Sequence, residues 1–164
     1  MTMVPLMKSG AQRFIAIVGP VGANDLSSYA GATDTIAATA YAATMAAYTD
    51  SLYDAGFDDV VLCTELPTTN STHNTRRNIL NPIYTDAYPG EAVTICDFAA
   101  DATMGPDAAA SDTNLYSDGT HPTATGQANL EAVIRSVLNG LMETPEPAQI
   151  LTAENAGGQL VESR

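Results

Sequence analysis

The sequence predicts an α/β protein built on a parallel sheet. Three short segments, at residues 13–19, 59–65 and 92–98, are apolar over consecutive positions, which is typical of strands covered on both faces. Longer segments with apolar residues at helical spacing separate these strands and follow the last one. This alternation favours parallel strands joined by right-handed crossovers, and such sheets form their binding sites at the carboxyl ends of the strands.

Composition limits the classes of partner. The 164 residues contain 6 Lys and Arg against 19 Asp and Glu, a formal net charge of -13. Because this charge repels phosphate backbones and anionic lipids, we expect no nucleic-acid partner. No apolar run approaches the ~20 residues of a membrane-spanning helix, so we expect no membrane span. One domain is expected at residues 1–142, followed by an acidic tail or linker at residues 143–164.

The first strand is followed by turn-forming residues, which predict a loop over residues 20–28. Residues 33–55 then place Tyr, Met and Leu side chains at helical spacing. Thr33 or Asp34 can cap the start of this helix, and Gly56 is suited to end it. The segment therefore predicts a long helix that packs its apolar stripe on the sheet.

The second strand leads into a polar loop over residues 68–75, in which His73 is expected to be solvated. The next helix is predicted over residues 75–84, with a break at Asn81 and Pro82, because proline suits the first turn of a new helix. This helix is therefore expected in two pieces.

The third strand is followed by a loop rich in Ala and Asp over residues 99–115. Its carboxylates lack the spacing of metal ligands, so we expect no metal site. The last helix is predicted over residues 125–142. In the tail, residues 149–152 and 159–162 offer a hairpin across residues 155–158, but a linker is favoured.

Two cysteines, Cys63 and Cys96, lie in separate predicted strands. Free cysteines behave as small buried apolar side chains, so two unreactive core thiols are favoured. A disulfide is the alternative, whereas a metal site with two cysteines lacks the usual ligand spacing. We therefore expect neither a metal nor another cofactor to depend on this pair.

The segment Ser117–Pro122 places an aspartate three residues before a histidine, in a loop bounded by glycine and proline. An aspartate that accepts the Nδ1 proton of a histidine fixes the tautomer and leaves Nε2 free as a general base. The spacing therefore makes Asp118 and His121 a candidate catalytic pair. The alternative is a plain loop that leads into the last helix, with Thr123 or Thr125 as the cap.

Two motifs in order, Gly-Ala-Asn-Asp after the first strand and Asp-Gly-Thr-His before the last helix, resemble blocks three and five of the SGNH (GDSL-type) hydrolase superfamily. The resemblance runs from about residue 14 to residue 141. It implies a flavodoxin-like three-layer sandwich that hydrolyses esters through an acyl-enzyme and needs no cofactor. It also implies His121 as general base, Asp118 as its orienting partner, Asn24 as oxyanion donor, and Gly22 and Asp25 in the substrate-binding turn.

The chain departs from the family at the nucleophile, because the Gly-Asp-Ser block of the family is absent before the first strand. Ser9 precedes any predicted strand, so the nucleophile is unassigned. A less favoured interpretation takes residues 24–28 as that block, with Ser27 or Ser28 as nucleophile. The family also has a central strand next to residues 14–18, and without it this segment is expected to be an exposed apolar edge that invites pairing with another chain.

Three explanations of the missing block remain open: the chain is the carboxyl-terminal part of a longer hydrolase, a partner chain supplies the block, or catalysis has been lost. We favour the first. The expected function is therefore that of an esterase or lipase-like enzyme acting on small acyl or carbohydrate esters, and the alternative is a non-catalytic binding or structural module. Residues 1–10 lack the apolar core of a signal peptide, and the sequence predicts no compartment, although a longer parent protein is compatible with secretion.

Overall fold

A single parallel sheet forms the centre of the protein. The structure, a computed structural model, describes residues 13–31, 33–143, 153–154 and 160–161. The strands lie in the order β1 (Ile15–Val18), β2 (Asp59–Cys63) and β3 (Thr94–Cys96), and both neighbouring pairs are parallel. Val18 lies opposite Leu62, and Cys63 lies opposite Cys96. The parallel sheet predicted from the apolar segments is confirmed.

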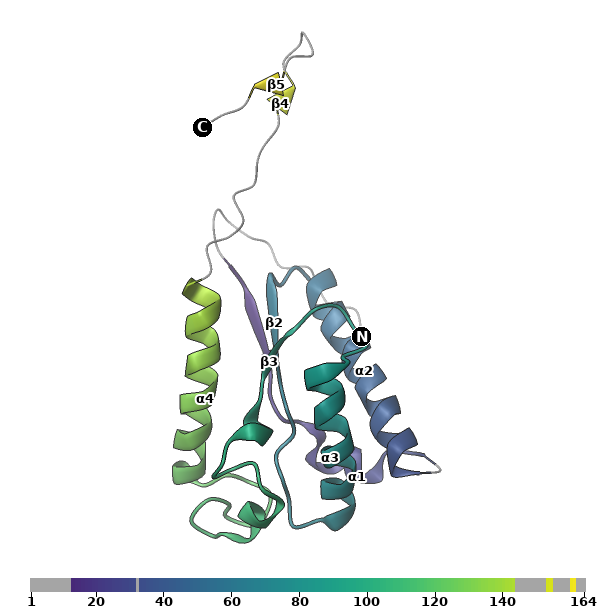
Figure 1. The fold of residues 1–164 in the computed structure, drawn as a ribbon, viewed down its shortest axis with the longest axis vertical. Coiled ribbons are helices and arrows are strands. Elements are labelled where there is room, and N and C mark those ends of the chain that lie inside the picture. The colour runs from purple at the N-terminus through teal and green to yellow at the C-terminus, as the bar shows by residue number, and fades with distance from the viewer. Residues whose placement is uncertain (1–12, 32, 144–152, 155–159, 162–164) are drawn as a thin grey trace.

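Helices cover both faces of this sheet, which gives three layers. Figure 1 shows α4 on one face and α2 with α3 on the other. The described helices are α1 (Gly22–Ser28), α2 (Asp34–Asp54), α3 (Ser71–Asp86) and α4 (Ala124–Glu143), with short 3-10 turns η1 (Phe98–Ala100) and η2 (Asp107–Ser111). The carboxyl ends of the three strands, α1 and both 3-10 turns lie at the same end of the molecule. None of the helices in the described ranges is both long and apolar enough to cross a membrane.

Two local predictions differ from the structure. The segment predicted as a loop forms α1, which begins directly at Gly22. The helix predicted with a break is continuous, because Pro82 lies within α3. Pro82 is exposed, so its ring faces solvent and the backbone hydrogen bond that it removes lies on the water side of the helix. The predicted start of α2 is confirmed, since the hydroxyl of Thr33 accepts a hydrogen bond from the N–H of Ile36.

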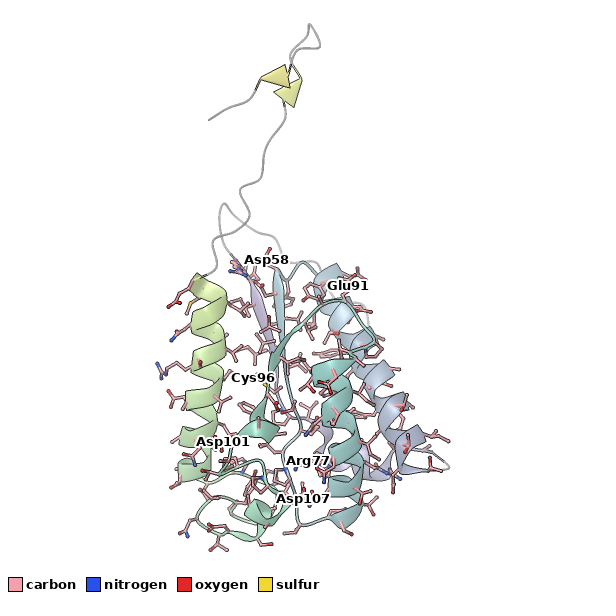
Figure 2. The ribbon with its side chains drawn as sticks, viewed as in Figure 1. Asp58, Arg77, Glu91, Cys96, Asp101 and Asp107 are labelled. Carbon is pink, nitrogen blue, oxygen red and sulfur yellow. The ribbon has the colours of Figure 1, made fainter. Side chains whose placement is uncertain are left out.

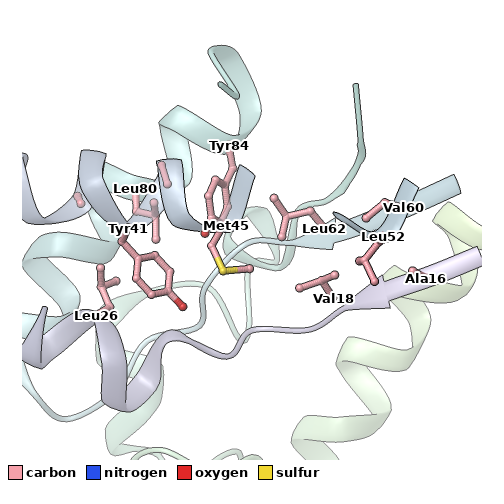
Figure 3. Packing of buried hydrophobic residues seen from close by; sticks show 12 residues of the cluster. Ala16, Val18, Leu26, Tyr41, Met45, Leu52, Val60, Leu62, Leu80 and Tyr84 are labelled. Atoms are coloured by element: carbon pink, nitrogen blue, oxygen red, sulfur yellow. The ribbon is translucent and has the colours of Figure 1, made fainter. Parts of the chain in front are cut away.

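The face towards α2 and α3 carries the better covered core. Alternate residues of β1 and β2 point into it, and Tyr41, Leu80 and Tyr84 of the two helices pack on them (Figure 3). The fully or nearly fully buried strand residues of this cluster are Ala16, Val18, Val60 and Leu62. Because the strands end under these helices, the packing fixes where their carboxyl ends lie.

The opposite face is covered by α4 and, near the carboxyl ends of the strands, by Phe98, Met104, Ala109 and Tyr116. Val61, Cys63 and Cys96 are fully buried there, whereas the apolar side chains of α4 are only half-buried. Ile17 of β1 points to this side and is 48% exposed. Within the described sheet β1 pairs with β2 only, so its outer edge carries no strand. The predicted edge position of β1 is therefore confirmed within the described sheet, but Ile17 is the one exposed side chain of residues 14–18, because the helices bury Ala16 and Val18.

Cys63 and Cys96 face each other across β2 and β3 as free, buried thiols, as predicted. The hydrogen bond that Cys63 donates to Cys96, together with burial, raises the pKa of the Cys63 thiol. In the tail, β4 (Ala153–Glu154) pairs antiparallel with β5 (Leu160–Val161). The hairpin is the less favoured prediction, and its first strand lies at residues 153–154, whereas residues 149–152 lie outside the described residues. The remaining residues of the predicted linker lie outside the described residues.

Candidate active site at the carboxyl ends of the strands

The loop that carries the candidate histidine is closed on itself and anchored in the core. The segments at Tyr116 and Pro122 form an antiparallel bridge, and the N–H of Ser117 donates to the carbonyl of His121 at 2.8 Å. The buried Tyr116 donates its hydroxyl proton to the carbonyl of Met104 at 3.1 Å. These contacts hold the loop in one position at the edge of the site.

Asp118 and His121 form the contact that their spacing predicts. Nδ1 of His121 lies 2.8 Å from Oδ2 of Asp118, and the backbone N–H groups of Thr120 and His121 donate to Oδ1 at 3.0 and 2.9 Å. The donated backbone and side-chain hydrogen bonds lower the pKa of Asp118 to about 2. The carboxylate is therefore ionised at neutral pH and accepts the Nδ1 proton, which leaves Nε2 of His121 as the basic nitrogen.

Gly119 makes this loop possible. Its φ angle is +79°, a backbone conformation that residues other than glycine rarely adopt. A Cβ atom at this position would lie 2.4 Å from the side chain of Thr69. The carbonyl of Gly119 accepts a hydrogen bond from the N–H of Thr69 at 2.9 Å. The Asp118–His121 loop is thus joined to the segment that follows β2.

A cavity of about 240 Å³ lies beside His121, and its walls come from five parts of the chain. Pro20 and Ala23 come from the segment after β1, Phe98 follows β3, and Leu130 comes from α4. The segment after β2 contributes Glu65, Leu66, Pro67 and Thr68, and the histidine loop contributes Thr120, His121 and Pro122. The cavity therefore lies where parallel sheets form their sites, as predicted.

The Gly22–Asp25 motif lies next to this cavity as the first turn of α1. Gly22 is buried, whereas Asn24 and Asp25 are exposed. Ala23 is the residue of the motif that lines the cavity with His121. Asp25 instead lines a separate hollow of about 380 Å³ against α2. The fold therefore brings the motif to the correct rim, with the side chain of Asn24 at the surface.

Glu65 connects the motif to the sheet. The N–H of Gly22 donates to both carboxyl oxygens of Glu65 at 3.0 Å, although 43 residues separate the two. Asn81 of α3 fixes the backbone of Glu65, because its amide oxygen accepts from the N–H at 2.9 Å and its amide nitrogen donates to the carbonyl at 3.0 Å. Burial raises the pKa of Glu65 to about 7, against the lowering effect of the N–H groups of Val21 and Gly22 and of the guanidinium of Arg77.

Arg77 and His73 lie beneath this wall, and sequence reasoning missed both. Arg77 is buried, donates to the carbonyls of Glu65 and Gly105, and pairs with Asp107 at 2.9 Å (Figure 2). His73 is fully buried in α3 with Nε2 2.9 Å from the carbonyl of Leu66, so the prediction of a solvated loop histidine is wrong. Burial lowers the pKa of His73, which favours its neutral form.

The nucleophile is not apparent among the described residues. No hydroxyl or thiol in the described ranges forms a hydrogen bond with Nε2 of His121. The hydroxyls of Ser27 and Ser28 donate to the carbonyl of Asn24 within their own helix, at 2.9 and 3.0 Å. Thr68 and Thr120 are the hydroxyl-bearing residues that line the cavity. Ser9 lies outside the described residues.

No group of three or more metal-binding side chains occurs in the described ranges. Comparison of the chain with known protein families, with curated proteins and with solved structures finds no match.

Proposed function

We propose that the chain carries the base and oxyanion side of an SGNH-type ester hydrolase that acts on small acyl or carbohydrate esters. The observation that carries the proposal is the contact between Asp118 and His121 beside a cavity that Ala23 of the Gly22–Asp25 motif also lines. The three-layer arrangement and the parallel sheet agree with the flavodoxin-like sandwich that the SGNH resemblance implies.

In the proposed reaction His121 acts as general base and then as general acid. Its Nε2 takes the proton of a nucleophilic hydroxyl as that oxygen bonds to the ester carbonyl carbon, and then gives the proton to the departing alcohol. Water hydrolyses the resulting acyl-enzyme by the same steps. Asp118 stays ionised, fixes the tautomer of His121 and stabilises the imidazolium that forms.

Asn24 is the proposed oxyanion donor. Its amide N–H groups are suited to the negative charge that develops on the carbonyl oxygen, and one such donor is typically worth about 3 to 4 kcal/mol in the transition state. Asn24 is exposed and follows Ala23, which lines the cavity, so the proposal requires the amide of Asn24 to turn towards that cavity.

The proposal is tested by ester hydrolysis with the complete protein as its gene encodes it, using p-nitrophenyl esters of short acids. His121→Ala is expected to lower kcat/KM by about 10² to 10⁴, the range that general acid–base catalysis contributes. Glu131→Gln, an exposed change on α4, serves as the matched control and should retain full activity. Equal rates for the His121→Ala protein and the unmodified protein would rule the assignment out.

A non-catalytic binding module is the second candidate, and it is favoured by the lack of a described hydrogen-bond partner for Nε2 of His121. A fluorophosphonate probe separates the two, because it labels an activated serine covalently. Labelling of the complete protein at a serine outside α1 supports the hydrolase. Labelling at Ser27 or Ser28 would restore the less favoured interpretation of residues 24–28, and no labelling with no hydrolysis supports the binding module.

A further inference from the structure

We propose that Glu65 is a positioning residue that holds the Gly22–Asp25 turn against the cavity, and that it does so more firmly when its carboxyl group is ionised. This inference rests on the proposed function, because it assigns a role to a residue of that same site. Glu65 lines the same cavity as His121.

The contact between Glu65 and Gly22 is specific in its shape. Both carboxyl oxygens lie 3.0 Å from the backbone nitrogen of Gly22, so the two oxygens share the N–H at the start of α1 equally. A Cβ atom on residue 22 would lie 2.8 Å from the carboxyl carbon, which is closer than such atoms approach in folded proteins. Glycine at this position therefore lets the backbone come up to the carboxyl group.

The carboxyl group cannot easily move away from the turn. Asn81 holds the N–H and the carbonyl of Glu65, and Arg77 donates a further hydrogen bond to that carbonyl at 3.1 Å. Glu65 is 2% exposed, so protein surrounds its side chain. Since its backbone is fixed by α3 and its oxygens contact α1, Glu65 transmits the position of one helix to the other.

The groups that face Glu65 come from every element around it. Asp25 of α1 raises its pKa, and Arg77 of α3 lowers it. The phenols of Tyr41 on α2 and Tyr84 on α3 are close enough to interact with its charge, and burial keeps both protonated. His121 lines the same cavity as Glu65, and the thiol of Cys63 on β2 also interacts with the charge of Glu65. Two more titratable groups lie in this region. Asp107 forms an ion pair with Arg77, and His73 has its Nε2 within hydrogen-bond distance of the carbonyl of Leu66.

Protonation changes what the carboxyl group can do for the turn. The ionised group offers two acceptor oxygens, and hydrogen bonds to a charged acceptor are the stronger kind. The protonated group keeps one full acceptor and turns one oxygen into a donor, and the N–H groups of Val21 and Gly22 that face it offer no acceptor for its proton. Ionisation therefore tightens the contact with Gly22, and protonation loosens it.

The test follows the amide of Gly22 by ¹H–¹⁵N NMR between pH 5.5 and 8.5. In the unmodified protein this resonance is expected to shift with a midpoint close to pH 7, because burial raises the pKa of Glu65 to that region. The shift should be lost in Glu65→Gln and kept in Glu131→Gln, which makes the same chemical change on an exposed part of α4. A Gly22 amide that does not titrate, or that still titrates in Glu65→Gln, overturns the proposal.

If Glu65→Gln does not fold, the side-chain carboxyl carbon of Glu65 is followed in the unmodified protein. It must share its midpoint with the Gly22 amide, and a different midpoint overturns the proposal. The His121→Ala variant keeps the two possible failures apart. Its Gly22 amide should titrate as in the unmodified protein whether or not hydrolysis is lost, so an unchanged rate of hydrolysis refutes the proposed function without touching the role of Glu65.

Discussion

The two walls of the cavity differ in how the protein holds their carboxylates. On one wall Glu65 is 2% exposed, accepts from Gly22 and is fixed by Asn81. On the other, the side chains of Asp118 and His121 are 56% and 76% exposed and depend on their own loop. Burial raises the pKa of Glu65 to about 7, whereas hydrogen bonds in solvent lower that of Asp118 to about 2. The pKa of a carboxyl group is thus raised at one position and lowered at another within the same candidate site.

This difference predicts where stability and chemistry reside. An exposed ion pair contributes little to stability because water screens it. Substitutions of Asp118 or His121 should therefore have little effect on the free energy of unfolding. A buried carboxyl group costs free energy whenever it is charged and whenever a partner is lost. We therefore expect the wall with Glu65 to dominate the stability of the site and the wall with His121 to dominate its reactivity.

The largest expected effect is on the pH dependence of stability. The pKa of Glu65 rises from its ordinary 4.5 to about 7 on folding, so the folded state favours the protonated form. This contribution is fully present below about pH 4.5 and is lost as the pH rises to about 7, a difference of about 3 kcal/mol. Urea unfolding of Glu65→Gln should lack this decline.

The control for that measurement is Glu131→Gln, which should show the same decline as the unmodified protein. Equal pH profiles for the unmodified protein and Glu65→Gln would mean that the two walls do not differ in this respect.

The next effect concerns Asn81. Removal of its amide by Asn81→Ala leaves the buried N–H and carbonyl of Glu65 short of partners, which we expect to cost about 2 kcal/mol in urea unfolding. The matched control on the same helix is Asn78→Ala. Its exposed amide donates to Asp107 at 3.0 Å, and its loss should change stability by less than about 0.5 kcal/mol. Similar losses for the two variants would contradict the assignment of Asn81 as a clamp.

The smallest effect on stability is expected at Asp118. Because its folded pKa is lowered, its contribution is present above the ordinary pKa of about 3.8 and is lost only as the pH falls towards 2. The carboxyl carbon of Asp118 should therefore titrate near pH 2 by NMR. Asp118→Asn should lower the urea midpoint only slightly at neutral pH, because the group is exposed, and should alter the tautomer of His121, seen in its ring ¹⁵N shifts. Titration at the ordinary value would show that the contact with His121 is not maintained in solution.

The sequence predicts the parts of this protein that depend on neighbouring residues. Asp118 and His121 are three residues apart, so their contact follows from local chain geometry, and the strands follow from continuous apolar segments. The contact between Glu65 and Gly22 joins residues 43 apart and depends on how two strands end beside each other. No local pattern marks it, because a glutamate at the end of a strand is usually solvated.

The same reason explains the error at His73. Polar neighbours suggest a solvated loop, but Asn70 caps α3 and begins the helix one turn earlier than the apolar spacing indicates. The turn that this adds carries His73 under the segment after β2, where it contacts Leu66. The role of Asn81 was hidden in a similar way, since its partner lies in a different element.

The outer edge of β1 carries no strand within the described sheet, so it is the edge at which a further strand can join. A guest strand laid along Ile15–Val18 with the same polarity would finish near Pro20, and the loop after it would then arrive at the mouth of the cavity. A guest of opposite polarity would finish at the far end of the sheet and leave the cavity untouched. The direction of the added strand thus decides whether its following loop lies at the cavity or whether the added strand only extends the sheet.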